Sequence, residues 1–141
     1  MTAKEYLSEL QLIQMEIEQL QEEREMYLEM ATSISVRLSP VKVQTSGSVD
    51  RIGDNTSKAA DLARMLDKKV NKLMEKQQEI TNMIRGLHDK NYIQVLYKVY
   101  VQFNTIKQAA VEMKRSYTYT LELHKKALAA FETVYADKLG I

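Results

Sequence analysis

The chain contains no cysteine, a single proline, four glycines and only two histidines among its 141 residues. Without cysteine there are no disulfides, thiolate metal ligands or cysteine nucleophiles. His88 and His124 occur without a His-Glu-x-x-His pattern, so the sequence gives no basis for a metal site. The scarcity of proline and glycine favours long helices over an all-β or α/β chain, which needs many turns. We therefore expect an all-α protein.

Catalytic motifs and long apolar runs are also missing. The sequence has no glycine-rich phosphate loop and no Gly-x-Ser-x-Gly elbow. No run approaches the roughly 18 apolar residues that span a bilayer. Residues 1–5 open directly into a charged amphipathic pattern, unlike a signal peptide. These features predict a soluble, intracellular protein that is not an enzyme, with no cofactor and no membrane association.

Apolar residues in the segment 2–38 repeat at alternating steps of four and three. The stripe consists of Tyr6, Leu10, Ile13, Ile17, Leu20, Tyr27, Ala31, Ile34 and Leu38, and only Arg24 interrupts it. Such heptad spacing keeps one face of a helix toward a partner helix. We expect Thr2 to cap this helix and Ser39-Pro40 to end it.

A second stripe predicts a helix from about Ser57 to Leu87, after a loop at 39–57. Its members are Ala59, Leu62, Leu66, Val70, Leu73, Gln77, Ile80, Ile84 and Leu87. The two stripes predict that residues 1–88 form a long antiparallel helical hairpin, or part of a dimeric coiled coil. Further apolar residues lie off the stripes and indicate more than one partner helix: Leu12, Met15, Met26, Met65, Met74 and Met83. Core filling is the ordinary role for these methionines.

The net charge of +1 divides unevenly along the chain. Residues 1–40 carry three basic and eight acidic side chains, a net of −5, whereas residues 41–88 carry nine basic and six acidic ones, a net of +3. Residues 89–141 carry eight basic and five acidic side chains, again +3. We therefore interpret Lys68, Lys69 and Lys72 as partners of the acidic first helix, and the acidic run at 22–25 as a solvated helix face.

Residues 89–141 are expected to form three helices. The first follows Asp89 as N-cap and carries Tyr92, Val95, Leu96, Val99 and Tyr100. The second follows Thr105, and the third begins at Ser116 and extends to about Tyr135. A short helix, a tight turn and a second helix form a helix-turn-helix. Small Ala109 and Ala110 allow these helices to approach, and we expect Leu121, His124 and Leu128 on the buried side of the last one.

In such a motif, the N-terminal residues of the second helix meet base edges and nearby cations reach phosphates. The candidate DNA-binding residues are Lys107, Lys114, Arg115, Ser116, Tyr117, Thr118, Tyr119, Lys125 and Lys126. The two tyrosines at 117 and 119 either stack on bases or pack against the helical arm. Glu122 faces the side where phosphate would approach, which weakens binding.

Four stretches carry a resemblance: residues 92–100 (YIQVLYKVY), 106–110 (IKQAA), 113–116 (MKRS) and 123–128 (LHKKAL). They resemble the sigma-factor region-4 type helix-turn-helix of small phage regulators. Residues 1–7, 29–32 and 76–80 resemble phage proteins from Gram-positive hosts related to the RinA and ArpU late-transcription regulators. The resemblance covers nearly the whole chain. It implies control of phage gene expression by binding double-stranded DNA, beside host RNA polymerase, in the cytoplasm of the bacterial host.

The chain departs from that pattern at three positions. Lys114 stands where glycine is usual, because the turn favours a left-handed backbone. Thr120 replaces a β-branched aliphatic residue, and Ala109 replaces an isoleucine. We expect the fold to tolerate these three changes. Strong DNA binding depends on how the changes affect the position of the recognition helix.

The resulting prediction is a homodimer with an oligomerisation arm at 1–88 and a helix-turn-helix domain at 89–141 that binds DNA. Two alternatives remain open. A terminase small-subunit-like packaging protein would use a similar head but assemble into a ring. A protein-binding inhibitor or adaptor would keep the fold and target a host enzyme, with little salt-sensitive DNA binding.

Overall fold

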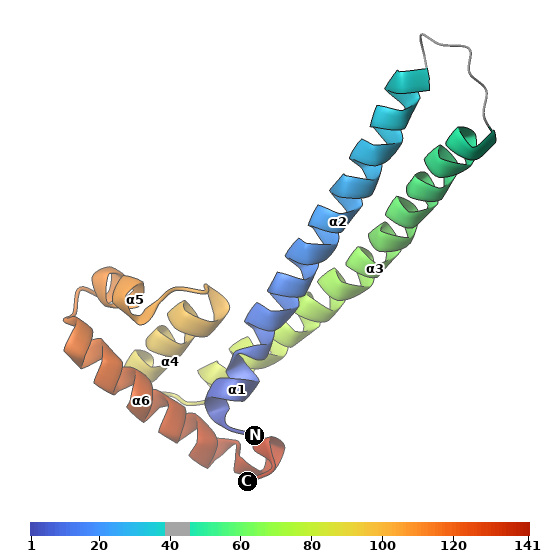
Figure 1. The fold of residues 1–141 in the computed structure, drawn as a ribbon. Helices are drawn as coiled ribbons and strands as arrows, with labels where there is room; N and C mark the ends of the chain where they lie inside the picture. The colour runs from blue at the N-terminus through green and yellow to red at the C-terminus, as the bar shows by residue number, and fades with distance from the viewer. Residues whose placement is uncertain (39–45) are drawn as a thin grey trace. The chain divides into compact units, whose positions relative to one another are not determined.

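The computed structural model describes residues 1–38 and 46–141, with side chains described at residues 1–32 and 51–141. Within these ranges every regular element is a helix, so the all-α prediction is confirmed there (Figure 1). The elements are α1 (Ala3–Leu7), α2 (Glu9–Leu38), α3 (Ser46–Arg85), α4 (Lys90–Leu96), η1 (Tyr97–Val101), α5 (Ile106–Met113), α6 (Tyr117–Val134) and α7 (Ala136–Leu139). None of these helices combines the length and apolar character needed to cross a membrane.

The first predicted helix is divided at Ser8, where α1 ends and α2 follows. Thr2 caps α1 as expected, because its side chain accepts a hydrogen bond from the backbone N–H of Glu5 at 3.1 Å. The prediction of one unbroken helix was wrong. The break allows the short α1 to bury Tyr6 and Leu7. The structure describes α2 as far as Leu38, and the end predicted at Ser39-Pro40 lies outside the described residues.

The second long helix starts earlier than predicted. The loop expected at 39–57 is helical from Ser46, while 39–45 lies outside the described residues. Asn55 is buried and Ile52 half-buried, so the spacing that leads to Ala59 continues backward along α3. Packing along this face therefore outweighs the low helix propensity of the glycines in this stretch.

Contacts divide the chain into two compact units. The terminal unit contains Met1–Ile13 and Leu73–Ile141, and the middle unit contains Gln14–Lys72. Residues 89–141, predicted as a domain of their own, thus pack together with both ends of the segment 1–88.

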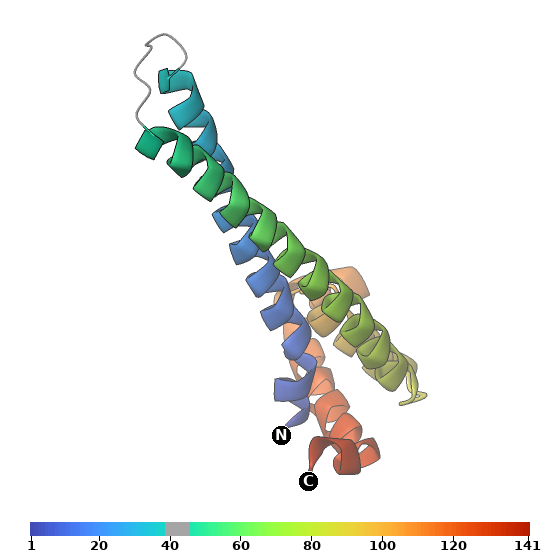
Figure 2. The same cartoon turned by 90° about the vertical axis from the view of Figure 1, so that its right-hand side faces the viewer.

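The middle unit consists of parts of α2 and α3 that lie side by side (Figures 1 and 2). Glu16 Oε2 lies 2.5 Å from Lys69 Nζ, and Lys58 Nζ lies 5.4 Å from the ring centre of Tyr27. From Glu16 to Tyr27 the residue numbers rise along α2, while those of their partners on α3 fall from Lys69 to Lys58. These segments of α2 and α3 are therefore antiparallel. The Glu16 contact confirms that Lys69 pairs with the acidic first helix. The pKa of Glu16 is lowered by the hydrogen bond from Lys69 and by the charge of that ammonium.

The stripe of the first helix is confirmed over its described length, and that of the second helix is confirmed except at two positions. Val70 and Gln77, predicted in the contact face, are exposed, and Lys69 and Lys76 are half-buried instead. Lysine stems can cover apolar surface while their ammonium groups remain in polar surroundings. The Lys76 ammonium lies 2.9 Å from Glu9 Oε2, in the terminal unit. Ion pairing thus explains why Lys69 and Lys76 lie in the contact face, next to the exposed Val70 and Gln77.

The core of the terminal unit joins segments from both ends of the sequence. Phe131 is fully buried, with its ring centre 6.2 Å from that of Tyr6 and 4.8 Å from that of Tyr135. The other large side chains buried with it are Leu7, Leu10, Ile80, Ile84, Val95 and Leu96. Burial of apolar surface is the dominant favourable term in folding. Residues 1–10 are therefore part of the same core as α4 and α6.

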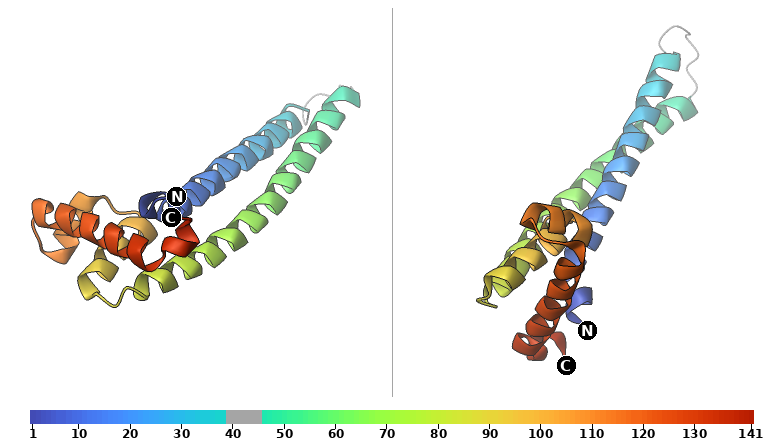
Figure 3. Two further views of the ribbon diagram at one scale, coloured as in Figure 1. Left: turned by 90° about the horizontal axis from the view of Figure 1, so that it is seen from below. Right: turned by 90° about the vertical axis from the view of Figure 1, so that its left-hand side faces the viewer.

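Polar contacts fasten the two chain ends within this unit, where the N and C labels lie close together (Figure 3). The Met1 ammonium donates to the Leu139 carbonyl at 3.1 Å, and the N–H of Ala3 donates to Glu132 Oε1 at 3.0 Å.

Glu79 on α3 is the centre of a further polar cluster. Its carboxylate accepts hydrogen bonds from the Lys138 ammonium at 2.6 Å and from the Tyr6 hydroxyl at 2.5 Å. The Lys138 contact, followed by that of Tyr6, lowers the pKa of Glu79. The cluster links α1 and α7 to α3.

The helix after Asp89 has a feature that the sequence did not predict. Asp89 is the expected N-cap, and its carboxylate accepts from the N–H groups of Asn91 and Tyr92. The helix ends in η1, a π-helical turn in which the N–H of Gln102 donates to the Tyr97 carbonyl at 3.0 Å. The chain then turns through Phe103, which has φ 59°.

Replacing Gly86 by alanine tests the junction between α3 and the C-terminal helices. An added Cβ would clash with the hydroxyl of Tyr135, which donates a 2.6 Å hydrogen bond to the Met83 carbonyl. We expect Gly86→Ala to lower the free energy of unfolding by about 1–3 kcal/mol in chemical denaturation. In a Tyr135→Phe background, which removes the clashing oxygen, the same substitution should cost less. Equal costs in the two backgrounds would contradict this packing.

Candidate nucleic-acid interface

The helix α5 begins with a reciprocal cap. The hydroxyl of Thr105 accepts from the N–H of Gln108 at 3.1 Å, and the Gln108 side chain accepts from the N–H of Thr105 at 2.8 Å. This pair satisfies two backbone donors that a helix start leaves free. Ala109 and Ala110 are buried where α5 contacts α6, as their small size predicts.

The turn between α5 and α6 has the left-handed backbone expected of it. Lys114 has φ 57° and ψ 43°, and its N–H donates to the carbonyls of Ala110 and Val111. The N–H of Arg115 donates to the Ala110 carbonyl at 3.0 Å. These bonds close the end of α5 within two residues. Lysine thus occupies a conformation that glycine adopts at lower cost.

The start of α6 is fixed by Ser116 and Thr120. The Ser116 hydroxyl accepts from the N–H of Tyr119 at 3.1 Å, and the Thr120 hydroxyl donates to the Ser116 carbonyl at 2.9 Å. Thr120 is fully buried. It anchors the first turn even though its hydroxyl replaces an aliphatic group, because that hydroxyl is hydrogen-bonded.

The buried face of α6 differs in part from the predicted one. His124 is buried as expected, but Leu121 and Leu128 are only half-buried. The buried positions are Thr120, Leu123, His124, Ala127 and Phe131. The predicted face is confirmed at His124, and Leu128 packs against the core. It is displaced by one residue at Leu121, where Thr120 is buried instead.

His124 has a structural partner in the core. Its Nε2 lies 2.7 Å from the hydroxyl of Tyr100, and the two rings stack with centres 5.6 Å apart. Burial, and then the charge of Lys4, lower the pKa of His124. Burial raises the pKa of Tyr100 to about 12. The prediction of a packed histidine is confirmed.

All nine candidate DNA-binding side chains are exposed. Four of them, Ser116 to Tyr119, occupy the first residues of α6 and its cap. Lys114 and Arg115 lie in the turn before them, and Lys107 lies in the first turn of α5. On the side of α6 away from its buried residues, the helical period aligns Thr118, Glu122 and Lys125.

Two shallow grooves flank the exposed side of α6. The groove next to α5 has a volume of about 600 Å³ and brings Lys107 and Tyr117 together with Thr105 and Ile106. The groove next to α4 has a volume of about 240 Å³, and its lining includes Tyr119, Lys126 and Asn91. The polar side chain of Asn91 is a possible contact that sequence reasoning missed, since only the capping role of its neighbour Asp89 was recognised.

Cations dominate this surface, although Glu122 and Asp89 contribute acidic side chains to the groove next to α4. Glu122 Oε1 lies 3.5 Å from Lys125 Nζ, and both side chains are largely exposed. The Arg115 guanidinium lies 5.2 Å from the ring centre of Tyr119, which orients this cation beside the start of α6. Such an array can bind the phosphates of a nucleic acid. The role of the nine candidate side chains as DNA contacts stays a prediction.

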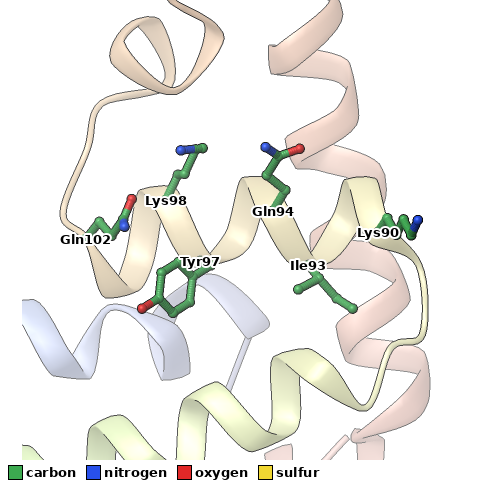
Figure 4. Close-up of a pocket in the computed structure, with 6 residues that line it drawn as sticks. All are labelled: Lys90, Ile93, Gln94, Tyr97, Lys98 and Gln102. Atoms are coloured by element: carbon green, nitrogen blue, oxygen red, sulfur yellow. The ribbon is translucent and has the colours of Figure 1, made fainter. Parts of the chain in front are cut away.

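A third groove, of about 520 Å³, lies along α4 and η1 (Figure 4). Figure 4 shows Ile93 and Tyr97 on one side of the helix and Gln94 and Lys98 on the other. The Lys98 ammonium lies 2.9 Å from Glu112 Oε2. This groove therefore combines half-buried apolar side chains with a paired cation.

Among the side chains described, those of residues 1–32 and 51–141, no group of three or more acidic or histidine residues is arranged to hold a metal ion. No protein-family model, curated protein or solved structure matches the chain.

Replacing Lys114 tests the left-handed turn. We expect Lys114→Gly to be more stable than Lys114→Ala by about 0.5–1 kcal/mol, because glycine relieves the backbone strain and alanine keeps the Cβ. Both variants remove the same charge, so the difference in their denaturation midpoints isolates the backbone. If alanine proved as stable as glycine, the backbone at this position would not be left-handed.

Burial of His124 predicts a pH-dependent stability. The unfolded chain binds a proton near pH 6.5, whereas the folded chain, with a lowered pKa, resists it. The free energy of unfolding should therefore fall as the pH drops below about 6.5. In denaturation series from pH 8 to pH 5, His124→Gln should flatten this dependence, while His88→Gln at an exposed position should retain it. An unchanged slope in His124→Gln would contradict the assignment.

Proposed function

We propose that this protein is a DNA-binding transcriptional regulator of phage type, with a sigma-region-4-like helix-turn-helix in its C-terminal part. The observation that carries the proposal is the α5–turn–α6 segment. Its helices start at side-chain caps and are joined by a two-residue connection that includes left-handed Lys114. The first turn of α6 is exposed beside a cluster of cations.

In this proposal, α6 enters the major groove of double-stranded DNA with its N-terminal turn foremost. Tyr117, Thr118 and Tyr119 meet base edges, and Ser116 holds this turn by capping it. The phosphate contacts come from Lys107, Lys114, Arg115, Lys125 and Lys126. The groove shared by Lys107 and Tyr117 leaves room on the α5 side for one sugar-phosphate strand.

Glu122 limits the affinity in this arrangement. Its carboxylate lies on the same side of α6 as Thr118 and Lys125, where it opposes the approach of phosphate. Lys125 offsets part of that charge at 3.5 Å. Binding is therefore expected to be moderate for one head.

We further propose that α2 and α3 form a long antiparallel hairpin that pairs two chains. Two heads on a two-fold axis would bind matched half-sites of the DNA. The family resemblance adds the expected setting, which is late phage gene expression in the cytoplasm of a bacterial host, beside the host RNA polymerase.

The second candidate function is binding to a host protein as an inhibitor or adaptor. The groove along α4 and η1 favours it, because Ile93 and Tyr97 offer half-buried apolar surface away from the cationic face of α6. In that case the helix-turn-helix serves as a scaffold.

Binding to duplex fragments of the genome that encodes the chain, measured at several salt concentrations, tests the proposal. We expect site-selective binding that weakens with salt, and its loss in Tyr117→Ala/Lys125→Ala/Lys126→Ala. Removing two phosphate-contacting lysines should also reduce the salt slope by about 2. Arg51→Ala/Arg85→Ala removes two exposed cations elsewhere and should bind like wild type.

Absence of binding by the wild-type protein at low salt would contradict the DNA-binding function. A stable complex with one host protein that is lost in Ile93→Ala/Tyr97→Ala would then establish the second candidate.

A further inference from the structure

The middle unit exposes more large apolar side chains than it buries. Among residues 14–32 and 51–72, the buried apolar side chains are Ile17, Ala31, Ala59 and Leu62, and two of these are alanines. The large apolar side chains exposed in the same ranges are Met15, Met26, Leu28, Met30, Met65 and Val70. Helices in proteins are stabilised mainly by packing of an apolar face. Because these two helices bury few large apolar side chains against each other, packing against a further protein surface would stabilise them.

Three of the exposed methionines share one face of α2. Met15, Met26 and Met30 are 43–49% exposed and project away from Ile17, which is buried toward α3. Glu22 falls on the same face. Glu23, seven residues before Met30, is exposed at the edge of this face. We call Met15, Glu22, Glu23, Met26 and Met30 the outer face of α2. Methionine side chains adapt readily to a partner surface.

The exposed flank of α3 has matching chemistry. Met65, Lys68 and Lys72 succeed one another at helical spacing and are exposed. We call these three residues the flank of α3. Among the described side chains, neither lysine has a carboxylate within 4.0 Å, whereas Lys69 pairs with Glu16. Lys72 acts on Glu16 of the same chain through its charge alone. Neither lysine is fixed in an ion pair, so both can contact an acidic surface that carries methionines.

The two helices of the middle unit carry opposite charges. Residues 14–32 contain six glutamates and one arginine, a net of −5, and residues 51–72 contain six basic and three acidic side chains, a net of +3. Packing α2 against α2 of another chain would bring like charges together. Packing α2 against α3 of another chain joins opposite charges and covers methionines on both sides.

We propose that the outer face of α2 docks on the flank of α3 in a second copy of this chain, and that the reciprocal contact completes a four-helix bundle. This inference deepens the proposed pairing of chains through the hairpin by assigning its surface. Glu22 and Glu23 of each copy face Lys68 and Lys72 of the other, so the interface is two-fold symmetric and repeats the same contact twice.

Charge reversal of the full-length chain, followed by sedimentation equilibrium, tests the assignment. Wild type is expected to be a dimer. Glu22→Lys/Glu23→Lys and Lys68→Glu/Lys72→Glu should each raise the dimer dissociation constant by at least about tenfold, because like charges then face one another. Lys107→Glu/Lys125→Glu, which changes the charge as much on the other unit, should remain dimeric.

Mixing the two reversed variants separates this pairing from its alternatives. A heterodimer of the two variants restores opposite charges in both contacts, so dimers should reappear in the mixture. A single chain with all four substitutions should likewise form homodimers. Recovery of dimers in the mixture also shows that each double variant remains folded.

A monomeric wild type, a dimer unaffected by the reversals, or a mixture that stays monomeric would each overturn the inference. Salt-sensitive DNA binding, measured on the same proteins, reports the proposed function separately. A wild-type chain that is monomeric and still binds a half-site would overturn the α2–α3 pairing and leave the DNA-binding function standing.

Discussion

Burial of Phe131 against Tyr6 and Tyr135 is the contact on which the terminal unit depends. It packs the last part of α6 onto α1, and the hydrogen bond from Tyr135 to Met83 fastens the same core to α3. Because α6 is held along its C-terminal half, its first turn can remain exposed without losing its position. The helix proposed to recognise DNA is thus supported by the two ends of the chain and by α3, which lie far apart in sequence.

Hydrogen bonds of buried polar side chains also stabilise the position of α6 in the terminal unit. Thr120 and His124 are buried on the inner side of α6, and each has a hydrogen-bond partner, Ser116 and Tyr100 respectively. Unpaired polar groups at these depths would be costly. The Thr120 bond stays within α6 and its cap, whereas the His124–Tyr100 bond joins α6 to η1 and so helps to fix the rotation of α6 about its axis. The rotation of α6 determines which of its residues face outward, and it places Thr118 and Lys125 on the exposed side.

Local signals in the sequence predicted much of this fold. The helix starts at Asp89, Thr105 and Ser116 depend on neighbouring residues alone, and all three are confirmed. The sequence did not predict features that depend on distant contacts, such as the π-helical turn η1, the burial of Thr120 and the half-buried Lys69 and Lys76. At the candidate site, each residue was found exposed, but the grooves that pair Lys107 with Tyr117 and Tyr119 with Lys126 required the packing of α4, α5 and α6.

The central claim is that the first turn of α6 contacts DNA. Its most direct test is to titrate the ¹⁵N-labelled protein with a selected duplex and follow the amide resonances by NMR. The proposed function predicts the largest shifts at Lys107 and at residues 114–119 and 125–126, with small changes at Ile93 and Tyr97. Shifts confined to α4 and η1, or none at saturating DNA, would contradict it.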